Sequence, residues 1–259
     1  MFIIIKTKLK YICTNIILKK FNIKVDYKFT MLLQLIKHVL IGFWFFVIAQ
    51  DFKVIISSEF SVKQEQVKKL KLRVQEILRE YVKFFELEHP VSGKVEINLV
   101  TDFSYHSRFK APKWSNAFFI NGRILIPKST LQNGDLDKTL RHELSHLVLY
   151  ENFGSNVPEW LDEGLALYLE GPQSELLRYF QLWKEAPTKI SLKNISRGMT
   201  SLKFSDVGKA YAISYVAVAS LLQKGHKDKI LRVLKNYKDK PNPRELASFI
   251  KLSEEQLKK

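Results

Sequence analysis

Strand signals gather in the first half of this chain and stop at Pro127, after which helical patterns run to the C-terminus. Residues 94–100 alternate polar and apolar side chains, as a strand with one solvated face does. Two short apolar segments flank Asn121-Gly122, a dipeptide typical of a two-residue β-hairpin. A β-branched stretch over 51–57 predicts a further strand. This separation predicts an α+β fold, in which a small mixed or antiparallel sheet with an edge hairpin packs on a helical layer.

The first 49 residues differ from the rest in charge and pattern. They contain eight Lys against one acidic residue, Asp26, and so carry +7 of the net charge of +16. Residues 1–30 show no sustained periodicity, and we interpret them as an N-terminal extension ahead of a true start at Met31. We therefore divide the chain into residues 1–30, a segment 31–49 and a domain over 50–259.

The segment 31–49 has the layout of an export signal. Lys37 and His38 precede an uninterrupted apolar run from Val39 to Ala49, which has the length of a signal-peptide core and is short for a membrane span. We expect a signal peptide or an uncleaved membrane anchor, and hence a periplasmic, extracellular or membrane-anchored protein. A buried helix of an intracellular protein is the alternative.

Residues 142–146 read His-Glu-Leu-Ser-His, in a segment where Asp135 can cap a helix. On such a helix His142 and His146 lie about 40° apart on one face. Two neutral imidazoles one turn apart can both bind a Zn²⁺ ion at about 2.0–2.1 Å. Glu143 then points to the side of the metal, where it can act as a general base toward water. The single cysteine, Cys13, excludes a zinc site made of several thiolates.

A catalytic zinc ion needs a third protein ligand, and the next helix offers carboxylates. Pro158 favours the first turn of a helix, and Glu163 follows within two turns. Gly164 is expected to let this helix approach its predecessor closely. Asp162 and Glu159 are competing carboxylates on other faces, and one of them is a candidate for orienting a metal ligand by a hydrogen bond.

The pattern His-Glu-x-x-His, followed by Trp-Leu-x-Glu-Gly-x-Ala, resembles the gluzincin metallopeptidases. The resemblance is to the peptidase MA-like domains, which are related to the catalytic domains of thermolysin and the zinc aminopeptidases. It implies that His142, His146 and Glu163 bind Zn²⁺, that Glu143 activates water, and that the substrate is a peptide or protein.

The resemblance continues downstream and also has gaps. The segment Tyr211-Ala-Ile-Ser-Tyr215 is similar to the helix on which zinc aminopeptidases carry the tyrosine that stabilises the oxyanion, which implies this role for Tyr211, with Tyr215 as the alternative. The hairpin 116–127 corresponds to the edge strand along which these peptidases align substrate. Thermolysin-type enzymes place an Asp four residues after the glutamate ligand to orient a histidine, whereas this chain has Leu167 there.

Three classes of function are consistent with these features. We favour a zinc metallopeptidase that is exported or tethered to a membrane through residues 31–49. A catalytically inactive zinc-binding module with a structural role would keep the same metal ligands. The excess of 42 Lys+Arg over 26 Asp+Glu suggests a nucleic-acid or membrane-surface binder, but part of that excess, +7 of +16, lies in residues 1–49, and we expect no nucleic-acid partner. The sequence pattern does not indicate an oligomeric state.

Overall fold

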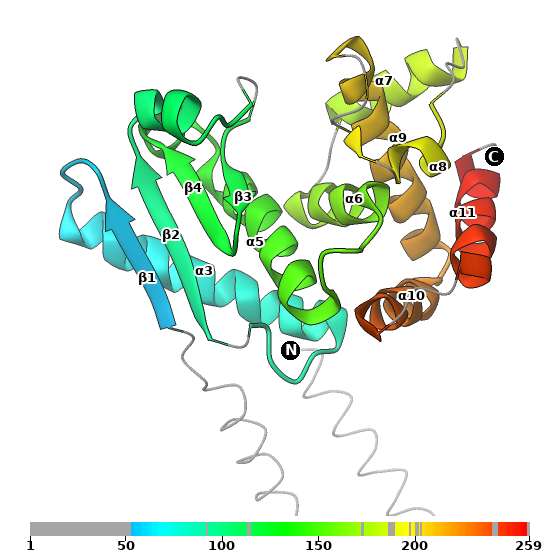
Figure 1. Ribbon diagram of the computed structural model, residues 1–259, viewed down its shortest axis with the longest axis horizontal. Coiled ribbons are helices and arrows are strands. Elements are labelled where there is room, and N and C mark those ends of the chain that lie inside the picture. The colour runs from blue at the N-terminus through cyan, green and yellow to red at the C-terminus, as the bar shows by residue number, and fades with distance from the viewer. Residues whose placement is uncertain are drawn as a thin grey trace, which may run out of the picture. The chain divides into compact units, whose positions relative to one another are not determined.

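The computed structural model in Figure 1 describes the unit that spans Asp51–Lys259. The predicted extension 1–30 and the predicted signal or anchor segment 31–49 lie outside the described residues. The described ranges are 53–91, 93–112, 115–171, 174–185, 190–196, 198–199, 202, 204–239 and 243–257.

Within these ranges the strands are β1 (Lys53–Ser58), β2 (Lys94–Val100), β3 (Phe118–Ile120) and β4 (Arg123–Pro127). They form one mixed sheet in the order β1-β2-β4-β3. The pairs β1–β2 and β2–β4 are parallel, and β3 is antiparallel to β4. The predicted α+β class with a small mixed sheet is therefore confirmed.

The hairpin between β3 and β4 turns at the two residues that the sequence indicates. Asn121 has a φ of 50° and Gly122 a φ of 75°, so both lie in the left-handed region that a type I′ turn requires. The turn places β3 at the edge of the sheet, where its outer side pairs with no other described strand.

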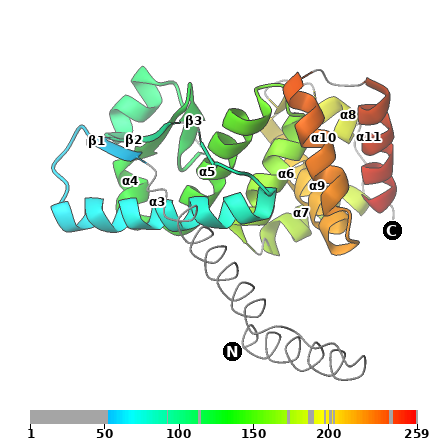
Figure 2. The same cartoon turned by 90° about the horizontal axis from the view of Figure 1, so that it is seen from below.

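Two long helices, α3 (Gln64–Phe85) and α5 (Leu136–Phe153), pack against one face of the sheet. Figure 2 shows α3 running along the whole length of this face. Alternate strand residues such as Val95, Ile97 and Ile124 are fully buried in the same cluster as the apolar sides of these helices. The alternation fixes the strand register, because a slip by one residue would turn these side chains to the other face.

The second half of the chain is helical (Figure 1). Its central helices are α6 (Glu159–Glu170) and α9 (Phe204–Gln223). The shorter or outer elements are η1 (Ser104–Arg108) and α4 (Lys128–Asn133) in the first half, and α7 (Ser174–Glu185), α8 (Leu192–Ile195), α10 (Lys227–Asp239) and α11 (Pro243–Leu257) in the second. Within the described residues, no helix combines the length and hydrophobicity that a bilayer crossing requires.

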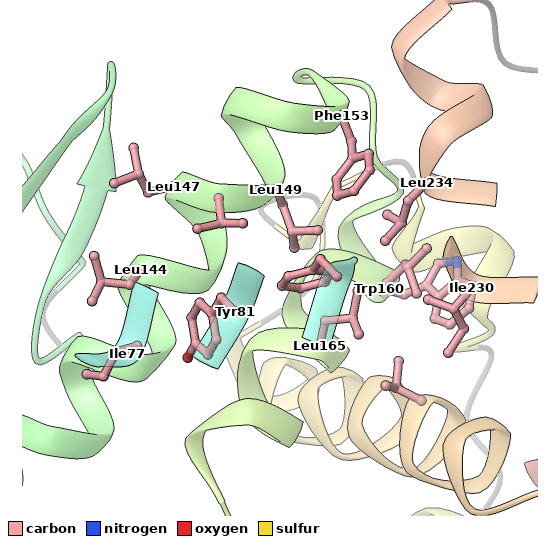
Figure 3. Close-up of a cluster of buried hydrophobic side chains, with 14 of the residues drawn as sticks. Ile77, Tyr81, Leu144, Leu147, Leu149, Phe153, Trp160, Leu165, Ile230 and Leu234 are labelled. Atoms are coloured by element: carbon pink, nitrogen blue, oxygen red, sulfur yellow. The ribbon is translucent and has the colours of Figure 1, made fainter. Parts of the chain in front are cut away.

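One hydrophobic core joins the two halves. Figure 3 shows Tyr81 of α3, Leu149 of α5, Trp160 and Leu165 of α6 and Leu234 of α10 in a single cluster. Trp160 is completely buried. Burial of each such side chain contributes on the order of 1.5–3 kcal/mol, so the cluster fixes α5 and α6 relative to each other.

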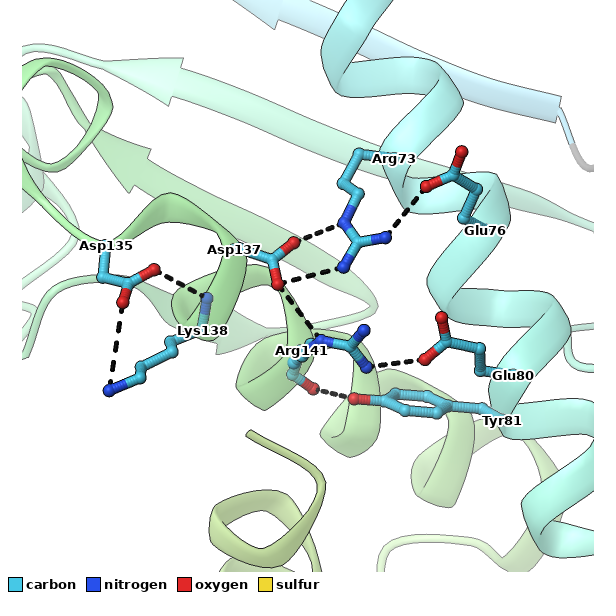
Figure 4. A network of polar contacts seen from close by, with 8 residues as sticks. All are labelled: Arg73, Glu76, Glu80, Tyr81, Asp135, Asp137, Lys138 and Arg141. Carbon is cyan, nitrogen blue, oxygen red and sulfur yellow. Dashed lines mark hydrogen bonds and ion pairs between the residues drawn. The ribbon is translucent and has the colours of Figure 1, made fainter. Parts of the chain in front are cut away.

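A polar network also fastens α5 to α3 (Figure 4). Asp137 accepts hydrogen bonds from Arg73 of α3 and from Arg141 of its own helix. Arg141 pairs in turn with Glu80 at 2.7 Å, and the buried Tyr81 hydroxyl donates to the Arg141 carbonyl at 2.6 Å. Because α5 carries the His-Glu-x-x-His motif, this network holds the motif against the sheet half.

Candidate metal centre

The structure brings His142 and His146 of α5 together with Glu163 of α6. The Oε2 atom of Glu163 lies 3.4 Å from Nε2 of His142 and 3.7 Å from Nε2 of His146. One ligand atom from each of the three residues lies within 4.8 Å of the other two. Two imidazoles and one carboxylate, which are borderline and hard ligands, form a donor set that suits a zinc ion.

The two imidazoles are oriented through their second nitrogen atoms. Nδ1 of His146 is 2.8 Å from Oδ1 of Asp162, and Nδ1 of His142 is 3.3 Å from Oε2 of Glu170. A carboxylate that accepts the Nδ1 proton fixes the tautomer in which Nε2 has a free lone pair. Both Nε2 lone pairs are therefore available on the side that faces Glu163.

A buried oxygen without a partner marks where a cation fits. Among the described residues, Oε2 of Glu163 is a buried atom that accepts no hydrogen bond. A buried unpaired carboxylate oxygen is costly, and the cost disappears when the oxygen binds a metal ion. The three residues thus fit a divalent metal ion by both chemistry and arrangement.

The electrostatic field of the site favours positive charge. Burial lowers the pKa of His142, but Glu163 and Glu170 outweigh this effect and raise it well above its ordinary value. Burial likewise opposes protonation of His146, yet Asp162 and Glu163 raise its pKa to about 9. The carboxylates that favour protons on these rings also favour a divalent cation, whose binding would release those protons.

Glu143 lies in the same site and has a different environment. It is buried, and burial raises its pKa, while the two histidines act in the opposite direction. The backbone N–H of Phe119 in β3 donates a hydrogen bond to its carboxylate. A carboxylate with a raised pKa beside a metal site is suited to accepting and returning a proton.

Helix α9 brings Tyr211 to the site. The Tyr211 hydroxyl is hydrogen-bonded to the Glu163 carboxylate. Burial and the charges of Glu163 and Glu159 raise the pKa of Tyr211, so the hydroxyl keeps its proton and remains a donor.

Close packing of α6 on α9 brings the Tyr211 hydroxyl to the Glu163 carboxylate. A Cβ atom on Gly164 would lie 2.5 Å from the carbonyl oxygen of Ser214 and 2.7 Å from a methyl group of Val218, both in α9. Gly164 therefore does allow a close approach, but the contact is with α9 and not with the preceding helix as the sequence suggested.

The site opens into a cleft of about 780 Å³. The lining comes from β3 and the segment before it, from α5, from α6 and from the first half of α9. The lining residues include Ser115, Asn116, Phe118, Phe119, Thr139, His142, Glu143, His146, Glu159, Asp162, Glu163, Leu167, Glu170, Met199, Leu202 and Tyr211. Tyr215, the alternative to Tyr211, is not among the described residues that line the cleft.

Comparison with protein families identifies the family that this arrangement of residues belongs to. The family model described as the Peptidase MA superfamily matches residues 114–245, just over half of the 259-residue chain. The chain belongs to the Peptidase MA superfamily. The matched range contains the hairpin, α5, α6 and α9, so this metallopeptidase has its candidate zinc ligands within the family region. Searches of curated proteins and of solved structures found no match.

Leu167 stands in this metallopeptidase where thermolysin-type enzymes have an aspartate, and its side chain cannot accept a hydrogen bond from a histidine. Glu170 occupies the place beside His142. It follows Glu163 by seven residues, or about two helical turns, and so lies on the same face of α6. The seven-residue spacing from Glu163 could have indicated Glu170 as a partner of a histidine ligand, but the sequence-based predictions do not include Glu170. Of the two competing carboxylates, Asp162 contacts a histidine, whereas Glu159 accepts a hydrogen bond from the Met199 backbone.

Proposed function

We propose that this metallopeptidase is a zinc-dependent peptide-bond hydrolase of the gluzincin type, with His142, His146 and Glu163 as metal ligands. The observation that carries the proposal is the convergence of three ligand atoms, one of them a buried oxygen without a hydrogen-bond partner, beside the buried carboxylate of Glu143. A zinc ion bound by this set supplies Lewis acidity, which lowers the pKa of water to about 7 and stabilises negative charge on a carbonyl oxygen.

The protein's own groups then move the proton and hold the substrate. Glu143 accepts a proton from the attacking water and returns it to the leaving nitrogen, a role that suits its raised pKa. The Tyr211 hydroxyl, which keeps its proton, donates to the oxygen on which negative charge develops. The side of β3 that pairs with no other described strand offers main-chain groups along which an extended peptide can add as a further strand.

Replacement of Glu143 by Gln tests the assigned base. The full-length chain is loaded with zinc, its metal content is measured, and hydrolysis of a pool of quenched fluorescent peptides is followed. We expect Glu143→Gln to keep its zinc and to lose about 10²–10⁴-fold in rate, the usual contribution of a positioned base. Glu88→Gln removes an exposed carboxylate from outside the cleft and should hydrolyse at the wild-type rate.

Two outcomes would contradict the proposal. An unchanged rate in Glu143→Gln would refute the role of Glu143. A wild-type protein that holds zinc but hydrolyses no peptide in the pool would favour the inactive zinc-binding module.

We propose in addition that residues 31–49 direct export, with the domain either released or tethered to a membrane. The support is the basic start and the apolar run of this segment. Cell fractionation and N-terminal sequencing of the expressed protein test this. An N-terminus at Gln50 would show cleavage, and a full-length chain in the membrane fraction would show a tether. An intact chain in the cytoplasm would contradict export.

A further inference from the structure

The cleft is acidic although the protein is basic. The chain has a net charge of +16, yet its described cleft-lining residues include no Lys or Arg and five carboxylates, which are Glu143, Glu159, Asp162, Glu163 and Glu170. A divalent metal ion would balance two of these five negative charges. An excess of negative charge therefore remains in the cleft when the metal is bound.

Four of the five carboxylates have a place in the candidate metal centre. Glu163 faces both Nε2 atoms, Asp162 and Glu170 contact the Nδ1 atoms, and Glu143 is buried beside them. Glu159 contacts neither imidazole by a hydrogen bond. Its Oε2 atom accepts from the Met199 backbone N–H at 2.7 Å, and no described Lys or Arg pairs with it.

Glu159 is placed to meet a bound peptide. It precedes Glu163 by four residues, so the two side chains lie one turn apart on the same face of α6, and the sequence-based expectation that Glu159 lies on another face than Glu163 was wrong. It is only partly buried, and it lines the same cleft as Phe118 and Phe119 of β3. A peptide that binds along β3 and fills the cleft would share that cleft with this carboxylate, which retains acceptor capacity after binding one N–H group.

We propose that Glu159 is a specificity-determining residue that binds a cationic group of the peptide substrate. The group is an ammonium or guanidinium cation, from a Lys or Arg side chain or from a free peptide N-terminus. The inference rests on the proposed peptide hydrolysis and adds a substrate class to it. A hydrogen bond between charged partners at this position should raise kcat/KM by about 10-fold or more.

Matched peptides test this on the zinc-loaded full-length chain. Each quenched fluorescent peptide carries Lys, Gln or Glu at one position flanking the cleaved bond, and each is made with a free and with an acetylated N-terminus. We expect Lys peptides to exceed Gln peptides about 10-fold in kcat/KM if a side chain supplies the cation. If the N-terminus supplies it, the same advantage should separate free from acetylated peptides.

Variants test whether Glu159 causes the preference for cationic peptides. Glu159→Gln keeps an acceptor for the Met199 N–H but removes the charge, so the preference should fall to near one. Glu159→Lys should reverse it in favour of Glu peptides, a change that a purely structural role would not produce. Glu65→Gln removes the same charge from an exposed site at the start of α3 and should keep the wild-type preference. Thermal melts establish that each variant is folded.

The outcomes separate the inference from the proposed function. Hydrolysis without preference in the wild type, or a preference that survives in Glu159→Gln, overturns the inference and leaves peptide hydrolysis standing. If the wild type cleaves no peptide, peptide hydrolysis fails, and a binding assay decides the inference. Fluorescence anisotropy of the Lys and free-N-terminus peptides then compares zinc-loaded Glu143→Gln with Glu143→Gln/Glu159→Gln. Equal affinities for both cationic peptides would overturn the inference, and weaker binding of either by the double variant would support it.

Discussion

Gly164→Ala should reduce activity far more than it reduces stability. The added Cβ atom would lie 2.5 Å from the Ser214 carbonyl oxygen, 2.9 Å from its carbonyl carbon and 2.7 Å from Val218 Cγ2. Ordinary contacts between such atoms are about 3.5 Å, so α9 must retreat by about 1 Å. The obstacle is backbone, which cannot move aside by a change of rotamer.

The two energetic effects on stability partly cancel. Overpacking of a well-filled interface costs about 1–3 kcal/mol, while Ala is favoured over Gly inside a helix by about 1 kcal/mol. We therefore expect a loss of about 0–2 kcal/mol. In a domain of this size that loss corresponds to a fall of up to about 8 °C in Tm.

The effect on rate is larger because α9 carries Tyr211, three residues before Ser214. A misplacement of about 1 Å in a catalytic group can cost about 10²-fold in rate. The proposed zinc ligands come from α5 and α6, so metal content should change little while kcat falls. Gly93→Ala is the matched control, because a Cβ atom there would meet nothing within 4 Å. Wild-type kcat and Tm in Gly164→Ala would refute the assigned contact between α6 and α9.

Tyr211→Phe should keep its zinc and lose about 10²–10³-fold in kcat, whereas a loss confined to KM would contradict the proposed role of Tyr211 at the oxyanion. Asp162→Asn and Glu170→Gln should each weaken zinc binding by about 10–100-fold in competition with a chelator. We expect Asp162→Asn to weaken zinc binding more than Glu170→Gln, because the contact of Asp162 with its histidine is the shorter of the two. Unchanged zinc affinities would show that these carboxylates are not needed to orient the imidazoles. Asp137→Asn should lower the free energy of unfolding at pH 7 by about 1 kcal/mol or less, since the pairs with Arg73 and Arg141 are partly exposed. Arg73 lowers the pKa of Asp137 in the folded state, so this stabilisation is present above the unfolded pKa of about 3.9 and disappears as the pH falls through the folded pKa. Urea unfolding of both proteins at pH 7 and below pH 4 measures this, and a difference that persists at low pH would contradict the ion-pair account.

Local patterns in the sequence are sufficient to predict several helices and strands. The polar and apolar alternation gives β2, and Asn121-Gly122 gives the hairpin, because each depends on neighbouring residues alone. Asp135 caps α5 as predicted, with its side chain accepting from the Lys138 backbone N–H. The parallel pairing of β1 with β2 and of β2 with β4 depends on contacts between distant segments, and no local pattern determines it.

The candidate site shows the same limit. The spacing of the motif predicts the arrangement of His142 and His146, and the next helix limits the third ligand to a few carboxylates. The partner of Gly164 could not be predicted, because a small residue allows a close approach without specifying which helix approaches. The structure assigns that approach to α9, and with it the position of Tyr211 beside Glu163.

Helix α6 illustrates why periodicity alone leaves function open. Leu161 and Leu165 occupy one face and are completely buried, while Glu159 and Glu163 lie on the opposite face. In an isolated sequence such a helix is typical of a protein surface, with its acidic face in water. Here that face lines the cleft, where a buried carboxylate destabilises the fold unless a cation or a hydrogen-bond donor contacts it. The burial of Leu161 and Leu165 offsets this cost, and it thereby allows the helix to hold a concentration of negative charge that a metal ion, and in our proposal a cationic substrate, neutralises.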